Sequence, residues 1–469
     1  MNRNNTLILF TLALFALLLI PSLVQQGMFL DGVTYAGISR NLANGVGSWW
    51  EPHYTKVLYP EFHEHPPLAF VLQSSFFTLL GDGFYTERIY CLLVALLTSW
   101  GIVAIWKLLA TDEVQKERYW MALLLWISVP MVLWSLKNNM LENTMGMFTV
   151  FAVFFILKAL IAQRFFYLSA GSLLILAAFL TKGAGGLFPL ATPLLYGLAF
   201  RKLKASIPFF IVLWLKFFAI SWLLLGLIPD ARISIWKYLD QQLLPVLNNE
   251  KAFTTGNRFR ILMNLVIDLS IPLLLVLSAL FAGLKKKNLM LIASNRNFLF
   301  LLLVAASASI PLIISMKQRK YYLIPSIPFY ALSFSFLAAG FVNHLLEKMK
   351  DPALKIIRII SFTLILVTLA LAVVRYGHFS RDREQLGDIY KIAGILPEGT
   401  ILGSDGTLCA DWGLAAYLNR VGSISLDCKA GHDYLLTTKS GTGIEDIEYI
   451  PVNLRLSKYR LLKRKQVKQ

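Results

Sequence analysis

Long apolar runs separated by short polar connections make up most of this chain. The runs are about 17 to 23 residues long, which is the length an α-helix needs to cross the hydrocarbon core of a bilayer. They lie near residues 7–24, 88–108, 119–135, 144–162, 165–181, 184–200, 206–228, 261–283, 297–315, 321–342 and 356–374. The run from Pro67 to Leu80 has only about 14 residues and predicts an interfacial or partly embedded helix. The pattern therefore predicts an all-α polytopic membrane protein with about 11–13 transmembrane helices.

The composition points to the same class. The 469 residues are 57% hydrophobic and 15% charged, with a mean hydropathy of +0.61. A soluble protein of this length could not keep so much apolar surface away from water. The first run, Leu7 to Val24, has no small-x-small cleavage site before the loop that follows, so we expect a retained first span and not a signal peptide.

Lysine and arginine indicate the topology. With the N-terminus inside, the inner connections carry the basic clusters Lys107/Lys116/Arg118, Lys158/Arg164, Arg201/Lys202/Lys204, Lys285/Lys286/Lys287/Arg296 and Lys348/Lys350/Lys355/Arg358. This positive-inside pattern accounts for most of the net charge of +18 without a nucleic-acid partner. The outer face then receives residues 31–67, 137–143, 181–183, 229–260 and 317–320, together with everything after Tyr376.

The chain changes character from about residue 380. Short β-like runs at 400–403, 423–426 and 434–437, with a helix-like stretch from Ala410 to Asn419, predict a small α/β appendage. We therefore divide the chain into a transmembrane domain, residues 1–378 with its first external loop at 25–87, and an extracytoplasmic α/β domain, residues 379–469. Cys409 and Cys428 could pair there if the segment is exported, although their spacing alone does not show it.

Acids and imidazoles mark both ends of the first external loop. Asp31 follows the first span and suits either a helix end or a general base that deprotonates an acceptor hydroxyl. His63-Glu64-His65 offers two imidazoles and a carboxylate, so a divalent metal held by Glu64 and His63 is one hypothesis. Adjacent residues rarely face one metal together, and no spaced partner is evident, so a site without metal stays open.

Further charges lie at the other predicted outer positions. Glu142 begins a span, where a carboxylate also interacts favourably with the helix dipole. The outer cations are Lys182, Arg258, Arg260, Lys317, Arg319 and Lys320. Cations gathered at an outer interface can bind lipid phosphate, either as general headgroup contacts or as a specific site. Walker, dinucleotide, HExxH and GxSxG motifs are absent from the sequence, which disfavours nucleotide-driven transport and common hydrolase mechanisms.

The first external loop resembles that of a known family, the ArnT-like and protein O-mannosyltransferase group of GT-C glycosyltransferases. In that group the loop opens with an acid followed by Tyr-Ala-x-x-(Ser/Ala)-Arg-Asn, which stands here as Asp31, Tyr35-Ala36 and Ser39-Arg40-Asn41. The group's Glu-(Lys/His)-Pro-Pro-Leu motif is similar to Glu64-His65-Pro66-Pro67-Leu68. Arg88 matches an arginine that opens the next span.

The resemblance continues along the chain to about residue 345. The acidic motif of the second loop looks like Glu142-Asn143-Thr144-Met145, and a Thr-Lys-Gly element looks like Thr181-Lys182-Gly183. A basic-Tyr-x-x-Pro element is similar to Arg319-Lys320-Tyr321-Tyr322-Leu323-Ile324-Pro325. The chain departs from the group at Gly32, where many relatives carry a second acid, and at His65, where aminoarabinose transferases carry lysine.

The resemblance implies roles for the matched residues. Asp31, Glu142 and Glu64 are the expected catalytic carboxylates. The residues expected to bind the donor phosphate are Lys182, Arg258, Arg319, Lys320 and His65, and those expected elsewhere in the site are Tyr35, Arg40, Arg88 and Tyr322.

The expected activity is transfer of a sugar from a polyprenyl-phosphate donor to an envelope acceptor (lipid A, a glycan or a protein). The expected place is the outer face of a bacterial inner membrane, with membrane lipid as a further partner. The alternative is a flippase or transporter of lipid-linked glycans. Such a transporter would need polar residues through the middles of several spans, where Lys216 and Asp268 are the main examples.

Overall fold

The computed structural model describes residues 2–248, 250, 254–283, 295–404, 406, 408–429, 431–439 and 448–465. The predicted inner cluster Lys285/Lys286/Lys287 lies outside these residues. The chain forms two compact units. The first unit comprises Met1–Ser22, Glu64–Pro66 and Cys91–Val374, and the second comprises Leu23–His63, Pro67–Tyr90 and Arg375–Gln469. The predicted domain boundary between residues 378 and 379 stays a prediction.

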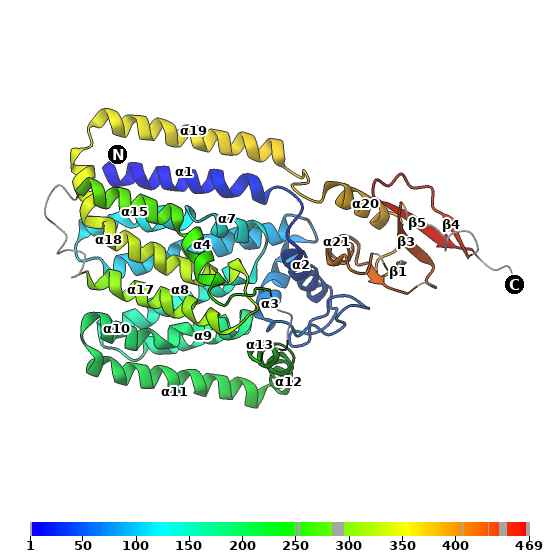
Figure 1. The fold of residues 1–469 in the computed structure, drawn as a ribbon, viewed down its shortest axis with the longest axis horizontal. Coiled ribbons are helices and arrows are strands. Elements are labelled where there is room, and N and C mark those ends of the chain that lie inside the picture. Colours follow the sequence, from blue (N-terminus) through cyan, green and yellow to red (C-terminus); the bar gives the residue numbers. More distant parts are fainter. Residues whose placement is uncertain are drawn as a thin grey trace. The chain divides into compact units, whose positions relative to one another are not determined.

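Long apolar helices dominate the fold. Among the described residues, eight helices are long and apolar enough to cross a membrane. They are α1 (Arg3–Leu23), α4 (Thr86–Leu109), α8 (Leu141–Ala162), α9 (Tyr167–Lys182) with η2 (Gly183–Gly186), α11 (Leu203–Leu227), α17 (Arg296–Ser309) with η6 (Ile310–Ile314), η7 (Lys320–Ser326) with α18 (Ile327–Lys348), and α19 (Asp351–Arg375). Figure 1 shows these helices and the C-terminal strands. The predicted class, a polytopic helical membrane protein with a small C-terminal α/β region, is confirmed.

The remaining predicted spans are bent or short, so the described part of the chain holds eight spans by length and composition, or up to ten if each bent pair is one span. The segment Glu113–Ile127, which ends with α6 (Trp120–Ile127), bends by 76° into α7 (Pro130–Lys137). Pro130 lacks an N–H group and starts the new helix at its first turn. A 51° bend separates α14 (Arg260–Asp268) from α15 (Ser270–Gly283). The predicted run 184–200 contains η3 (Phe188–Ala191) and α10 (Thr192–Phe200), a shorter apolar helix.

Helix packing in the first unit separates a buried centre from an apolar exterior. The helices α8 and α9 pack together, as do α17 and α18. The apolar window of η7 and α18 is 89% buried, whereas those of α11 and α19 are only 11% buried. Two helices that expose this much apolar surface need an apolar solvent around them. The fold therefore belongs in a bilayer. The unit also holds α12 (Pro229–Tyr238), η4 (Leu239–Leu243) and α13 (Leu244–Leu247).

The second unit combines the first loop with the C-terminal segment. Its helices are α2 (Leu30–Ala43), α3 (Leu68–Leu80), α20 (Arg383–Ala393) and α21 (Trp412–Gly422). The helix α2 packs on α3 and on α21, so segments far apart in sequence share one core. A disulfide joins Cys409 to Cys428, so the pairing that spacing left open is formed.

A five-stranded sheet completes the second unit, with strand order β2-β1-β3-β5-β4. The strands are β1 (Ile401–Ser404), β2 (Ser425–Asp427), β3 (Tyr434–Thr438), β4 (Tyr449–Pro451) and β5 (Tyr459–Arg464). Strand β1 pairs parallel with β2 and β3, and β5 pairs antiparallel with β3 and β4. The three β-like runs expected from sequence correspond to β1, β2 and β3, and the helix-like stretch corresponds to α21.

Candidate functional site

A cavity of about 520 Å³ lies wholly within the first unit. Its polar lining includes Glu64, His65, Glu142, Lys182, Tyr238, Gln242, Lys317 and Tyr322. Its apolar lining includes Met145, Leu187, Phe188, Leu243, Val246, Pro311, Leu312 and Ile314. Cavities of this size bind small molecules when a few polar groups converge among apolar walls. This combination suits a ligand with a charged head and an apolar tail.

Lys182 and Glu142 form a buried ion pair at this cavity. The Lys182 Nζ atom lies 2.7 Å from Glu142 Oε1, and the two side chains are 9% and 0% exposed. Glu142 stands in the first turn of α8, and Lys182 is the last residue of α9, which packs on α8. The Lys182 ammonium also lies 5.6 and 5.7 Å from the ring centres of Tyr321 and Tyr322. The carboxylate and the two rings therefore surround the ammonium where bulk water does not reach it.

The glycine of the Thr-Lys-Gly element allows this geometry. Gly183 caps α9 with φ +80°, a left-handed conformation that other residues adopt at a cost. A Cβ atom at Gly183 would collide with the Tyr238 hydroxyl and ring. Gly183 therefore lets α9 end beside the cavity while α12 brings Tyr238 against it. Burial raises the pKa of Tyr238 to about 12, partly offset by a backbone hydrogen bond at Ala184, so its phenol stays protonated at neutral pH.

The Glu64-His65 segment forms part of the same cavity. Gln242 Nε2 donates a hydrogen bond to Glu64 Oε1 at 3.3 Å, which fixes the carboxylate against the segment that follows α12. Burial, together with the positive charges of Lys182 and Lys317, holds the pKa of His65 well below its ordinary value of 6.5. At neutral pH His65 is therefore an uncharged imidazole that donates or accepts a hydrogen bond.

Lys317 is held at the cavity by its neighbour Gln318. The Gln318 side chain donates to the Arg258 carbonyl at 2.6 Å and accepts from the Ile261 amide at 3.0 Å. Thr254 Oγ1 accepts from the Gln318 amide at 2.6 Å. These bonds join two segments of the predicted outer face and fix the backbone beside Lys317.

The sequence-predicted site residues do not all reach the cavity. Arg258, Arg319 and Lys320 are exposed and are not among the residues that line it. Asp31 belongs to the second unit, where it stands half-buried in the first turn of α2. Tyr35, one turn further along α2, is buried, and its ring centre lies 5.7 Å from that of Phe70.

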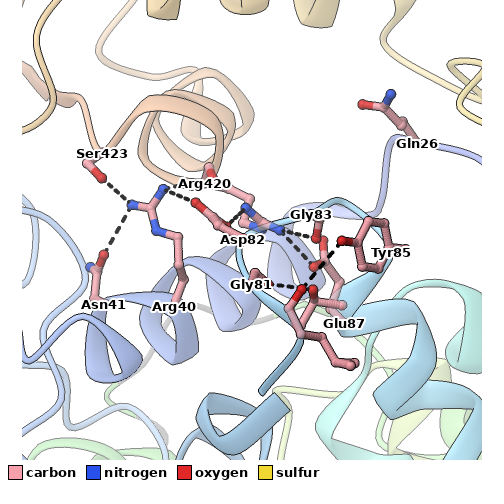
Figure 2. Close-up of polar contacts among 12 residues, drawn as sticks. Gln26, Arg40, Asn41, Gly81, Asp82, Gly83, Tyr85, Glu87, Arg420 and Ser423 are labelled. Carbon is pink, nitrogen blue, oxygen red and sulfur yellow. Dashed lines mark hydrogen bonds and ion pairs between the residues drawn. The ribbon is translucent and has the colours of Figure 1, made fainter. Parts of the chain in front are cut away.

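Arg40 belongs to an ion network of the second unit that joins buried side chains to the exposed Asp82, shown in Figure 2. Its guanidinium donates to the Arg420 carbonyl at 2.9 Å and to Ser423 Oγ at 2.7 Å, and lies 3.5 Å from Asp82 Oδ2. Arg420 also bonds Asp82, and it pairs with Glu87 Oε2 at 2.9 Å. The network fastens α2 to α21.

Arg88 is buried near the start of α4. It donates to the Gly27 carbonyl at 2.9 Å and lines a smaller cavity of about 90 Å³ in the second unit.

Metal-ligating side chains do not cluster at the predicted metal position. His63 Nε2 lies 3.7 Å from Glu61 Oε2 in the second unit, while Glu64 bonds Gln242 in the first. Across the described ranges of the chain, no group of three or more His, Cys, Asp or Glu side chains could hold a metal ion. A metal at Glu64 would therefore need ligands from substrate or water.

Three polar residues of the cavity, Lys317, Tyr238 and Gln242, were not among the predicted site residues. Lys317 stood in the same basic cluster as Arg319 and Lys320, and nothing local distinguished it. Tyr238 and Gln242 lie in the long connection 229–260, where the only available signal was a polar segment at the predicted outer face.

Comparisons with known proteins relate one segment of the chain to a mannosyltransferase family and the whole chain to a glycosyltransferase fold. Residues 64–224 match the family described as dolichyl-phosphate-mannose-protein mannosyltransferase. Among solved structures, the chain is similar to ArnT from Cupriavidus metallidurans bound to undecaprenyl phosphate, with a TM-score of 0.63, 15% identity and 98% of each chain covered. The apo state of that protein matches with a TM-score of 0.61, 15% identity and 97% of each chain covered.

A third solved structure is the Archaeoglobus fulgidus oligosaccharyltransferase in the apo form. It matches with a TM-score of 0.53 and 13% identity, covering 90% of this chain and 64% of that chain. Among curated proteins, no sequence matches significantly.

The fold is therefore that of the GT-C glycosyltransferases, as the sequence motifs predicted. The segment that matches the mannosyltransferase family contains the ionisable cavity residues Glu64, His65, Glu142 and Lys182.

Proposed function

We propose that this protein transfers a sugar from a polyprenyl-phosphate donor to an acceptor of the cell envelope. The observation that carries the proposal is the cavity of the first unit, where Lys182 and Lys317 meet Glu64 and Glu142 beside an apolar wall. Undecaprenyl phosphate is the ligand of the ArnT structure whose fold this chain shares. A lipid phosphate matches both kinds of wall, because its anionic head suits the lysines and its apolar tail suits the apolar side chains.

The cavity residues would stabilise the leaving group. When the bond between the anomeric carbon and the phosphate oxygen breaks, the lipid phosphate keeps the electron pair and gains negative charge. Lys182 and Lys317 are positioned to neutralise that charge, and preorganised cations in a water-poor site contribute strongly to such a step. The protonated Tyr238 and the neutral His65 would supply hydrogen bonds. Arg258, Arg319 and Lys320, which are exposed, would attract the anionic headgroup toward the membrane surface.

Asp31 is the proposed general base, a role that rests on the family resemblance. In the proposed inverting displacement, the acceptor hydroxyl gives its proton to the Asp31 carboxylate as its oxygen bonds the anomeric carbon. The products are the glycosylated acceptor and the free polyprenyl phosphate. Glu64 and Glu142 would orient the donor and hold the cations in place. Tyr35, Arg40 and Arg88 would support the helices that carry the site.

We place the reaction at the outer face of a bacterial inner membrane. The basic clusters of the predicted inner connections support this orientation. The Cys409–Cys428 disulfide supports it independently, because such bonds persist in oxidising compartments. Lipid A, a glycan and a protein are the acceptor classes considered.

A divalent metal bound at Glu64 is tested by removing metal ions with a chelator. Full sugar transfer after chelation would exclude such a metal from the reaction.

The test is a transfer assay with purified full-length protein, polyprenyl-phosphate sugars and cell-envelope acceptors. Wild type should release free polyprenyl phosphate and glycosylate an acceptor, whereas Asp31→Asn should lose about 10²-fold or more in rate. A Lys204→Met variant, on the exposed start of α11, is the control for a lost cation. Movement of intact lipid-linked sugar across vesicles without any transfer would favour the flippase instead.

A further inference from the structure

A cavity larger than the one at Arg88 also lies wholly within the second unit. It measures about 370 Å³, within the range of about 300–1,000 Å³ usual for small-molecule sites. Its walls come from the end of α2, from the loop through Pro60, from the turn before β1 and from the end of α21. Most of the cavity lies outside the residues that the family motifs match.

The walls are tied together by hydrogen bonds. Asn41 Nδ2 donates to the carbonyls of His53 at 3.1 Å and Tyr54 at 2.7 Å, which holds the loop against α2. On the other side, Lys56 Nζ donates to the Gly399 carbonyl at 2.7 Å, and the Lys56 amide donates to Ser425 Oγ at 3.0 Å. The first external loop is thereby fixed to both α2 and the C-terminal segment, and the cavity is preformed.

One buried side chain of the lining lacks a partner. Asn419 is 3% exposed, and its amide nitrogen has no hydrogen-bond partner within the described part of the chain. That nitrogen has no exposed surface and lies against Gly37 of α2, so Asn419 forms part of the cavity wall and does not offer this donor to a ligand. The nearby Asn44 and Glu398 are exposed, and their side chains are available to a ligand.

The lining suits a neutral polyhydroxylated ligand. It combines amides and hydroxyls with the imidazole of His53, one lysine and one glutamate, and the charges of Lys56 and Glu398 balance. Sugar hydroxyls both donate and accept hydrogen bonds, and such a mixed lining satisfies both roles. Val46 and Pro60, both exposed, add an apolar face for the C–H side of a pyranose. An anionic or cationic headgroup would instead require a net charge of opposite sign.

We propose that this cavity binds a saccharide unit of the acceptor. The assignment of that saccharide to the acceptor rests on the proposed function. The binding of a saccharide by the cavity does not depend on it. The helix α2 connects the two functions, because it carries the proposed base Asp31 in its first turn and Asn41 of the cavity near its end. At 1.5 Å per residue these positions are about 15 Å apart along the helix axis, a separation that an acceptor of several sugar units can span.

The test is saturation-transfer NMR on the full-length protein in detergent, with methyl glycosides of hexoses and N-acetylhexosamines as probes. With wild type, saturation of the protein signals should be transferred to at least one bound probe. The double variant Asn44→Ala/Glu398→Ala should weaken the binding of that probe about tenfold, equivalent to one or two lost hydrogen bonds. The matched controls Asn453→Ala and Glu384→Ala, exposed positions of the same unit that do not line the cavity, should bind as wild type does.

The outcomes separate this proposal from the proposed function. Asp31→Asn should lose transfer and keep saccharide binding. Binding without any transfer by wild type would refute the glycosyltransferase assignment and leave the saccharide site standing. If wild type transfers sugar but binds no probe, the saccharide site is overturned. It is also overturned if the double variant binds the probes as wild type does. Displacement of the probes by a peptide acceptor at the same residues would also overturn it.

Discussion

The ammonium of Lys182 lies 2.7 Å from the Glu142 carboxylate at the wall of an apolar cavity. Helix α9 ends at Lys182 and helix α8 begins beside Glu142, so the pair joins two helix ends. A buried pair of this kind is costly to break from one side, because the remaining charge has no water to solvate it. We interpret Lys182 as a cation that Glu142 holds in position at the cavity, where a donor phosphate can bind it.

Removing only Lys182 should therefore harm both folding and activity. Lys182→Met should destabilise the protein by about 3–5 kcal/mol, because Glu142 is left buried without its cation. The neutral double variant Lys182→Met/Glu142→Gln should recover much of that stability but still lose about 10²-fold in kcat/KM for the donor. Thermal unfolding in detergent and the transfer assay measure the two effects. Full activity in the double variant would remove the pair from the donor site.

Lys317 should matter more than the exposed cations beside it. Lys317→Met should lower kcat/KM for the donor about tenfold or more at every salt concentration, since Lys317 lines the cavity. Arg319→Met, two residues away and exposed, should have a smaller effect that disappears at high ionic strength. If both variants lost kcat/KM equally, and independently of salt, Lys317 and Arg319 would not differ in role as we propose.

Gly183 should not tolerate a side chain. Gly183→Ala places a Cβ atom against Tyr238 and forces alanine into a left-handed conformation, with an expected loss of about 1–3 kcal/mol. Gly226→Ala is the matched control, because its Cβ atom would meet nothing within 4 Å and its position is helical. Thermal unfolding of both variants tests the contact, and equal melting temperatures would argue against it.

His65 should make the protein less stable in mild acid. Its pKa is lowered by folding, so below pH 6.5 the unfolded chain takes up a proton that the folded chain does not. Stability then falls as pH decreases from 6.5 toward the folded-state pKa, by up to about 1.4 kcal/mol per pH unit. The His65→Asn variant lacks this contribution, so its stability relative to wild type should rise between pH 7 and pH 5. A pH-independent difference would place His65 in a solvated environment.

The spans and the α/β appendage were predictable because their signals are local. An apolar run long enough to cross a bilayer, or a short β-like run beside turn residues, identifies itself without distant partners. Two strands of the sheet were not predicted. Strand β5 lies within the basic C-terminal segment, where Tyr459, Leu461 and Leu462 are buried between charged neighbours. Their burial depends on pairing with β3, which local sequence does not reveal.

The candidate site was predictable only in part, for the same reason. Glu64, Glu142 and Lys182 were found from motifs, and the fold brings them to one cavity. The sequence could not separate Lys317 from Arg319, because the hydrogen bonds of Gln318 decide which cation faces the cavity. Arg40 was assigned to the site by resemblance, whereas its partner Arg420 lies 380 residues away.

The most direct test of the central claim is to follow both products of one reaction. Purified protein is incubated with a radiolabelled polyprenyl-phosphate sugar and envelope acceptors, and free polyprenyl phosphate and labelled acceptor are quantified together. We predict equal amounts of both products from wild type, and formation of both about 10²-fold slower from Asp31→Asn and from Lys182→Met/Glu142→Gln. Undiminished product formation by both variants, or lipid-linked sugar that stays intact with wild type across the donors and acceptors tested, would contradict the account.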